Sequence, residues 1–104
     1  MEYRLMITRR AEDLLDNLVG YLLLELGNEP AAVRLLDGME RIYCRLEQNP
    51  FQFPASSDRY LSGKGYREAL VPGMGYRVIF CVTGESVTVL GIFHQLESLR
   101  GRVL

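Results

Sequence analysis

The fold is decided by one stretch late in the chain, Tyr76–His94, which reads YRVIFCVTGESVTVLGIFH. Apolar and polar residues alternate on both sides of a central Gly84-Glu85 pair, as they do in two half-buried strands joined by a tight turn. The stretch therefore predicts a β-hairpin with strands over residues 76–83 and 86–93, in which Thr83 lies opposite Ser86.

Alternation in this hairpin predicts one apolar face and one more polar face. The apolar face, which we expect to meet the helices, carries Tyr76, Val78, Phe80, Val82, Val87, Val89 and Phe93. If the register holds along the whole hairpin, Arg77 lies across from Ile92 on the polar face. It is then diagonal to His94, the single histidine of the chain, and within its reach.

The Arg77–His94 pair has two interpretations. As a phosphate site, Arg77 would bind a phosphate oxygen or stabilise developing negative charge, and His94 would transfer a proton near neutral pH. As ordinary surface, both are solvated side chains near the end of a strand, which is the commoner outcome for such residues. Spacing alone leaves both interpretations open.

Two segments upstream show helical periodicity and suitable ends. The first begins after Thr8, and its apolar stripe comprises Ala11, Leu14, Leu15, Leu18, Val19, Leu22 and Leu26. The second begins after Asn28, ends before Asn49-Pro50, and has a stripe of Ala32, Leu35, Leu36, Met39, Ile42, Tyr43 and Leu46. Because only a Gly-Asn pair separates them, the two helices form an antiparallel hairpin.

Shorter elements complete the predicted topology. Residues 2–8 predict a first strand, residues 50–65 a long loop, and Tyr66–Val71 the strand before the hairpin; Gln95–Arg102 could be a short C-terminal helix or an irregular tail. The order β-α-α-β-β-β in 104 residues indicates one α+β domain, with the helical hairpin packed on one face of a small antiparallel sheet.

Charge is distributed unevenly although the formal net charge is only −1. Residues 1–58 hold six basic and ten acidic side chains, whereas residues 59–104 hold six basic and three acidic ones, so the two parts carry −4 and +3. The basic residues of the second part could line a nucleic-acid groove, or be solvated charges balanced locally by Asp58 and Glu68. They include Arg59, Lys64, Arg67 and Arg77, with Tyr60 and Tyr66 available to stack on bases.

Several classes of protein are excluded by composition. With 48% hydrophobic and 24% charged residues, the chain is neither disordered nor a coiled coil. Cys44, Cys81 and the lone histidine lack metal-ligand spacing, so we expect reduced thiols, no metal and a cytoplasmic protein. Neither a signal peptide nor a membrane span is expected, because apolar runs such as Tyr21–Leu24 are short.

Taken together, a series of short motifs resembles the RelE/ParE superfamily, the toxins of bacterial type II toxin–antitoxin systems. The motifs are Thr8-x-x-Ala11-x-Asp13-Leu14, Leu18 and Tyr21, Ala31-Ala32 with Leu35-Leu36, Leu46-x-x-Asn49-Pro50, Tyr66-Arg67, Gly75–Phe80, and Val87-x-Val89-x-x-Ile92-Phe93-His94. The resemblance covers nearly the whole chain and implies the fold described above.

The resemblance also implies a toxin that a cognate antitoxin holds silent, without a cofactor. RelE-type members cleave mRNA in the ribosomal A site, whereas ParE-type members bind DNA gyrase and inhibit it. On the family pattern Arg77 matches a strand arginine that binds phosphate in RelE-like enzymes, and His94 matches a histidine found in both branches. Arg67 is the third catalytic candidate, and Arg59, Lys64 and Tyr66 are the RNA-binding candidates, although no family motif fixes the roles of these four. We expect the antitoxin to wrap the domain with an extended or helical segment and to neutralise the arginines of the second part.

The sequence departs from the RelE pattern at its end. Many ribonuclease members follow the histidine with one or two arginines and a tyrosine five positions on, where this chain has Gln95, Leu96 and Leu99. Three hypotheses therefore stay open: a RelE-like endoribonuclease, favoured because it gives Arg77 and His94 a shared role; a ParE-like inhibitor of gyrase; and a degenerate toxin that only binds its antitoxin. A homodimer is also left open.

Overall fold

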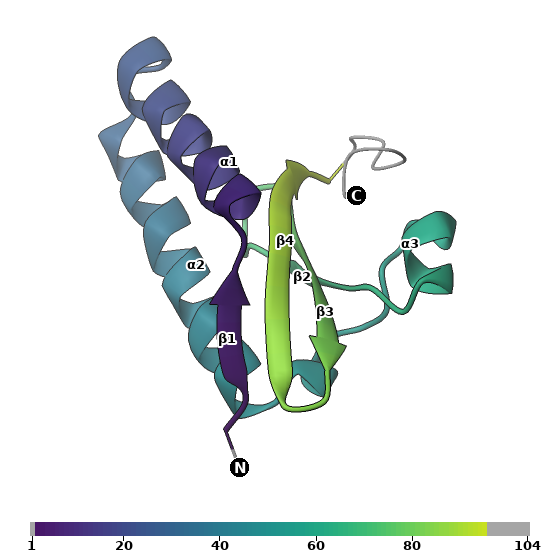
Figure 1. Ribbon diagram of the computed structural model, residues 1–104. Coiled ribbons are helices and arrows are strands. Elements are labelled where there is room, and N and C mark those ends of the chain that lie inside the picture. The colour runs from purple at the N-terminus through teal and green to yellow at the C-terminus, as the bar shows by residue number, and fades with distance from the viewer. Residues whose placement is uncertain (1, 96–104) are drawn as a thin grey trace.

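The computed structural model describes residues 2–95 and consists of a four-stranded sheet with helices on both faces (Figure 1). The strands are β1 (Arg4–Ile7), β2 (Arg67–Leu70), β3 (Tyr76–Thr83) and β4 (Ser86–His94), in the spatial order β1-β4-β3-β2. The α+β class is confirmed. The sheet is mixed rather than wholly antiparallel, because the β2-β3-β4 meander brings β4 beside β1 with the two strands running in the same direction.

A helical hairpin covers one face of the sheet, as predicted (Figure 1). It consists of α1 (Arg9–Gly20), the π-helix η1 (Tyr21–Glu25) and α2 (Glu29–Gln48). The side chains of Thr8 and Asn28 cap the two α-helices: each accepts a hydrogen bond from the backbone amide three residues on, at 3.0 and 3.1 Å.

The end of the first helix differs from the prediction. In η1 the amide of Leu26 donates to the carbonyl of Tyr21, at 3.1 Å, so the turn spans five residues instead of four. The wider turn keeps Leu22 in the core and places Leu26 off the apolar stripe, where it is exposed. Leu36 on α2, also expected in the core, is exposed as well.

The segment expected to be a loop contains two short helical turns, η2 (Pro50–Gln52) and α3 (Arg59–Gly63). Asp58 starts α3, because its Oδ1 accepts hydrogen bonds from the amides of Tyr60 and Leu61 at 2.9 and 3.1 Å. Figure 1 shows α3 on the face of the sheet opposite to α1 and α2, which we call the outer face.

The sheet separates a large core from a small one. On the helix-facing side, the main core contains fully buried side chains from α2, β3 and β4, including Leu35, Leu46, Val78, Phe80 and Val87. On the outer face, Leu61 of α3 packs on Ile79 and Phe93. Because α3 adds its own apolar contact, both faces of β3 are buried, which the alternating pattern did not predict.

The register of the β3–β4 hairpin agrees with the prediction only near the turn. From Thr83–Ser86 to Phe80–Val89 the expected pairs are present, but Ile79 lies opposite Gly91. Leu90 is therefore an additional residue in β4, a β-bulge, and beyond it each residue of β4 points to the other face. The predicted faces are wrong from this point on: Ile92 joins the main core, whereas Phe93 lies on the outer face opposite Arg77.

The predicted C-terminal helix or irregular tail lies outside the described residues, apart from Gln95. The amide of Gln95 donates to the carbonyl of Gly75 at 2.8 Å, so the β3–β4 pairing extends to the last described residue.

Candidate functional site

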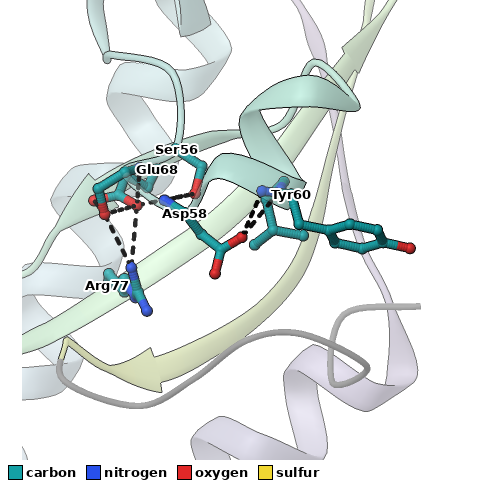
Figure 2. Close-up of polar contacts among 7 residues, drawn as sticks. Ser56, Asp58, Tyr60, Glu68 and Arg77 are labelled. Carbon is teal, nitrogen blue, oxygen red and sulfur yellow. Dashed lines mark hydrogen bonds and ion pairs between the residues drawn. The ribbon is translucent and has the colours of Figure 1, made fainter.

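The most elaborate polar cluster of the outer face surrounds Arg77 and Glu68, on the adjacent strands β3 and β2 (Figure 2). Nη1 of Arg77 lies 3.5 Å from Oε1 of Glu68 and donates to the Ser57 hydroxyl at 3.1 Å. The two side chains are only 7% and 9% exposed. Because the pair is buried, removing either member leaves an uncompensated charge.

The serines before α3 complete the cluster. Glu68 accepts hydrogen bonds from both hydroxyls, Ser56 at 3.2 Å and Ser57 at 3.1 Å, and from the Ser57 amide at 2.9 Å. The Ser56 hydroxyl in turn accepts from the amide of Asp58, the residue that caps α3. We call Ser56, Ser57, Glu68 and Arg77 the latch, because together they fasten the segment before α3 to the sheet (Figure 2).

The latch decides what Arg77 can do. Its side chain is buried and its Nη1 is engaged by Glu68 and Ser57, so an external phosphate would have to compete with the Glu68 carboxylate for Arg77. The sequence indicated Glu68 as a local counter-charge but did not identify it as the partner of Arg77. The sequence did contain a signal for this pairing. β2 and β3 are joined by a short turn, so Glu68 and Arg77, which face the same side of this antiparallel pair, are neighbours.

His94 does not meet Arg77. Because of the bulge at Leu90, His94 lies opposite Tyr76, on the helix-facing side, and its ring makes an edge-to-face contact with the Tyr76 ring at 6.1 Å between centroids. It borders a hollow of about 220 Å³ between α1 and the end of β4. The predicted juxtaposition of His94 with Arg77 is therefore wrong.

Arg67 lies apart from both. In β2 it is opposite Phe80, so it too faces the helix side of the sheet. Its Nη1 donates to the carbonyl of Phe53 at 2.6 Å, and its guanidinium lies 5.0 Å from the centre of the exposed Phe51 ring. The three catalytic candidates thus occupy three separate places and do not form one site.

The three predicted RNA-binding residues are in or next to α3. Arg59 and Lys64 are exposed, and Nζ of Lys64 lies 4.8 Å from the centre of the Tyr60 ring. Tyr66 is half-buried against the small core of the outer face. At α3, the positive charge of Lys64 therefore lies beside the Tyr60 ring and not beside the Tyr66 ring.

Other reactive groups of the described chain add little to a catalytic site. Burial raises the pKa of the Cys81 thiol, which lowers the fraction of reactive thiolate near neutral pH. Across residues 2–95, no three His, Cys, Asp or Glu side chains are grouped as a metal site would require. No helix in that range is both long and apolar enough to cross a bilayer.

Comparison with solved structures is informative about the fold. No protein-family model matches the sequence, and a search of curated proteins finds no match. A solved structure titled "Chromosomal ParDE TA system from P. aeruginosa" contains a chain that superposes with a TM-score of 0.71. The alignment covers 89% of this chain and 96% of that chain at 21% identity. The protein therefore has the RelE/ParE-like fold that its sequence resembles, the fold of a chain from a toxin–antitoxin system.

Proposed function

We propose that this protein is the toxin of a type II toxin–antitoxin pair. The proposal is supported by the fold it shares with a chain of a ParDE system and by the motifs that resemble the RelE/ParE superfamily along nearly the whole sequence. We expect its partner to be a cognate antitoxin.

We further propose that it acts by binding DNA gyrase, as ParE-type toxins do, rather than by cleaving RNA. The observation that carries this proposal is the latch: Arg77, the candidate for phosphate binding, is buried and paired with Glu68. His94, the candidate acid or base, lies on the opposite face. Metal-independent RNA cleavage needs a proton-transfer group and a charge-stabilising group at the same phosphate, and these two residues cannot reach one phosphate together.

A second candidate, the RelE-like ribonuclease, is favoured by one observation. Arg59 and Lys64 are exposed on α3, and the Lys64 ammonium sits over the Tyr60 ring, so α3 offers positive charge beside an aromatic surface. This combination suits single-stranded nucleic acid. In that case α3, rather than the sheet face, would be the part of the molecule that contacts RNA.

The two functions are distinguished by inducing the protein without an antitoxin and measuring DNA and protein synthesis by pulse labelling. Gyrase inhibition predicts that purified protein blocks supercoiling in vitro, while protein synthesis continues after induction. Translation arrest with cleaved mRNA, relieved by the Arg59→Ala/Lys64→Ala double variant, would overturn the gyrase proposal in favour of the ribonuclease. Growth without any defect would contradict both the gyrase and the ribonuclease proposals, and antitoxin binding would be the only remaining function. The matched control is Arg4→Ala, an exposed arginine of β1.

The antitoxin has a charge requirement of its own. The part of the chain from residue 59 carries a net charge of +3, so an antitoxin that neutralises it should bind less tightly as salt is raised. An affinity that is indifferent to salt would contradict this electrostatic contribution while leaving the pairing itself intact.

A further inference from the structure

Most of the exposed large hydrophobic side chains of residues 2–95 lie at or near the tip of the helical hairpin. Nine large hydrophobic side chains are exposed among residues 2–95, and six of them lie between residues 21 and 36. These six, which we call the tip patch, are Tyr21, Leu23, Leu24, Leu26, Val33 and Leu36. Leu24 is 84% exposed. Isolated exposed leucines are ordinary, whereas a concentration of this kind marks an interaction surface.

The backbone conformation of η1 helps to expose this patch. The π-helix η1 rotates its side chains relative to a continuous α-helix, so Leu22 alone of Tyr21–Glu25 is buried. Single π turns cost stability and are often kept at functional sites. In Figure 1 the hairpin extends past the end of the sheet, so no strand lies beneath the tip to cover these side chains.

Most charges near the tip patch are acidic. Residues 16–33 contain three acidic side chains, Asp16, Glu25 and Glu29, and no lysine or arginine. Glu25 and Glu29 lie within the tip itself and are exposed. One basic residue, Arg34, lies between the patch residues Val33 and Leu36.

The acidic charge near the tip patch favours some binding partners over others. A second copy docking tip to tip would bring two acidic rims together, and an anionic membrane or a nucleic acid would be repelled in the same way. A helix with leucines on one side and lysines or arginines flanking them would bury the tip patch and pair with its rim. We propose that the hairpin tip is a docking surface for a basic amphipathic helix of another protein. This inference stands independently of the proposed function.

The test measures binding of synthetic peptides to the purified protein by fluorescence anisotropy at about 150 mM salt. The probe is an amphipathic leucine–lysine helix of about 18 residues, or five turns. The first control peptide has the same composition in a scrambled order that destroys the apolar face. The second replaces every lysine by glutamate. We expect the amphipathic basic peptide to bind roughly tenfold more tightly than either control.

Matched variants assign the binding to the tip. Leu24→Ser and the double variant Glu25→Lys/Glu29→Lys should each weaken binding of the basic peptide roughly tenfold, because one removes apolar area and the other reverses the rim. Leu70→Ser, an exposed leucine on β2, should leave it unchanged. All these positions are exposed, so the variants fold, and circular dichroism verifies this.

Three outcomes would overturn the proposal. Equal binding of the scrambled and amphipathic peptides would show attraction by charge alone. An unchanged affinity in Leu24→Ser would place the peptide elsewhere on the molecule. Concentration-dependent dimers of the unbound protein that disappear in Leu24→Ser would make a second copy the occupant.

Discussion

Arg77 and His94 lie on opposite faces of the sheet, although an uninterrupted hairpin would have placed them side by side. The cause is a single additional residue, Leu90, after which the side chains of β4 exchange faces. The Arg77 guanidinium is next to Glu68 and Ser57 because β2 pairs with β3, whereas the bulge places the His94 imidazole next to the Tyr76 ring. Any activity of this protein has to use the two residues separately.

The latch should contribute to folding stability. Arg77→Met leaves the Glu68 carboxylate buried without its counter-charge, and we expect the free energy of unfolding to fall by about 3–5 kcal/mol. Adding Glu68→Gln should restore part of this loss, because a neutral amide still accepts hydrogen bonds from the serines without carrying a buried charge. Urea denaturation of the two single variants and the double variant measures the coupling. Strictly additive losses would mean that the pair contributes nothing.

This expectation affects how toxicity experiments are read. A variant of Arg77 that fails to stop growth has lost either an activity or its fold, so the folded fraction has to be measured in the same cells. His94→Ala is better suited to testing chemistry, because the side chain is exposed and lies outside the latch.

Gly91 should be irreplaceable on steric grounds. A Cβ at this position would lie 2.6 Å from the buried ring of Phe93 and 3.1 Å from Leu14. We expect Gly91→Ala to destabilise the protein by about 1–3 kcal/mol through overpacking. Gly20→Ala is the control, since a Cβ there meets nothing within 4 Å, and it should stabilise α1 by about 0.5–1 kcal/mol. A thermal denaturation midpoint unchanged by Gly91→Ala would contradict this close packing.

The two cysteines should differ in reactivity. Cys44 is exposed on α2, whereas Cys81 is partly buried and burial raises the pKa of its thiol. Alkylation requires the thiolate, so iodoacetamide at mildly alkaline pH should label Cys44 first and Cys81 much more slowly. Mass spectrometry over a time course measures both rates, with labelling of the urea-unfolded chain as the reference. Similar rates for the two thiols in the folded protein would contradict the prediction.

Alkaline pH should destabilise the fold through Tyr43. Burial, and secondarily the charge of Glu12, raise the pKa of this phenol above its ordinary value of 10.0. Between the unfolded and the folded pKa, the unfolded chain loses the proton and the folded chain keeps it. Stability is therefore intact below pH 10.0 and declines as pH rises through the folded pKa.

The measurement is the urea midpoint as a function of pH from about 8 to 11. Tyr43→Phe should remove part of the decline, and Glu12→Gln should make the decline smaller and end it at lower pH, because the folded phenol then loses one source of its raised pKa. Cys81 contributes with the same sign from its ordinary value of 9.0, so a Cys81→Ala background isolates the tyrosine. A decline that persists unchanged in Tyr43→Phe would rule this phenol out as its cause.

Features encoded in short segments could be predicted from the sequence. The caps at Thr8 and Asn28 are single side chains that bond three residues ahead, and the Gly84-Glu85 turn fixes its flanking pairs. The extent of the helical hairpin follows from periodicity. None of these features depends on a distant part of the chain.

Features that depend on distant contacts could not be predicted. The only local sign of the bulge at Leu90 is Gly91, since a glycine inside a strand often marks a bulge, and this sign does not say which residues exchange faces. The placement of α3 depends on Leu61 reaching Ile79 and on the latch, both of which join segments separated in sequence. The π-helix interrupts a stripe that reads as continuous. The predicted site was wrong because one additional residue in β4 moves the later side chains of that strand to the other face without changing its composition.

The spatial order of the strands has a consequence for synthesis. β4 pairs with both β1 and β3, yet it is the last of the four to leave the ribosome. Until residues 86–94 emerge, β1 has no strand to pair with and the helical hairpin has no complete surface to pack on. Closure of the sheet therefore joins Arg4 to Ser86, a contact of long sequence separation that delays folding until residues 86–94 have been synthesised. Nascent chains ending before β4 should be substrates for proteases rather than partially active proteins.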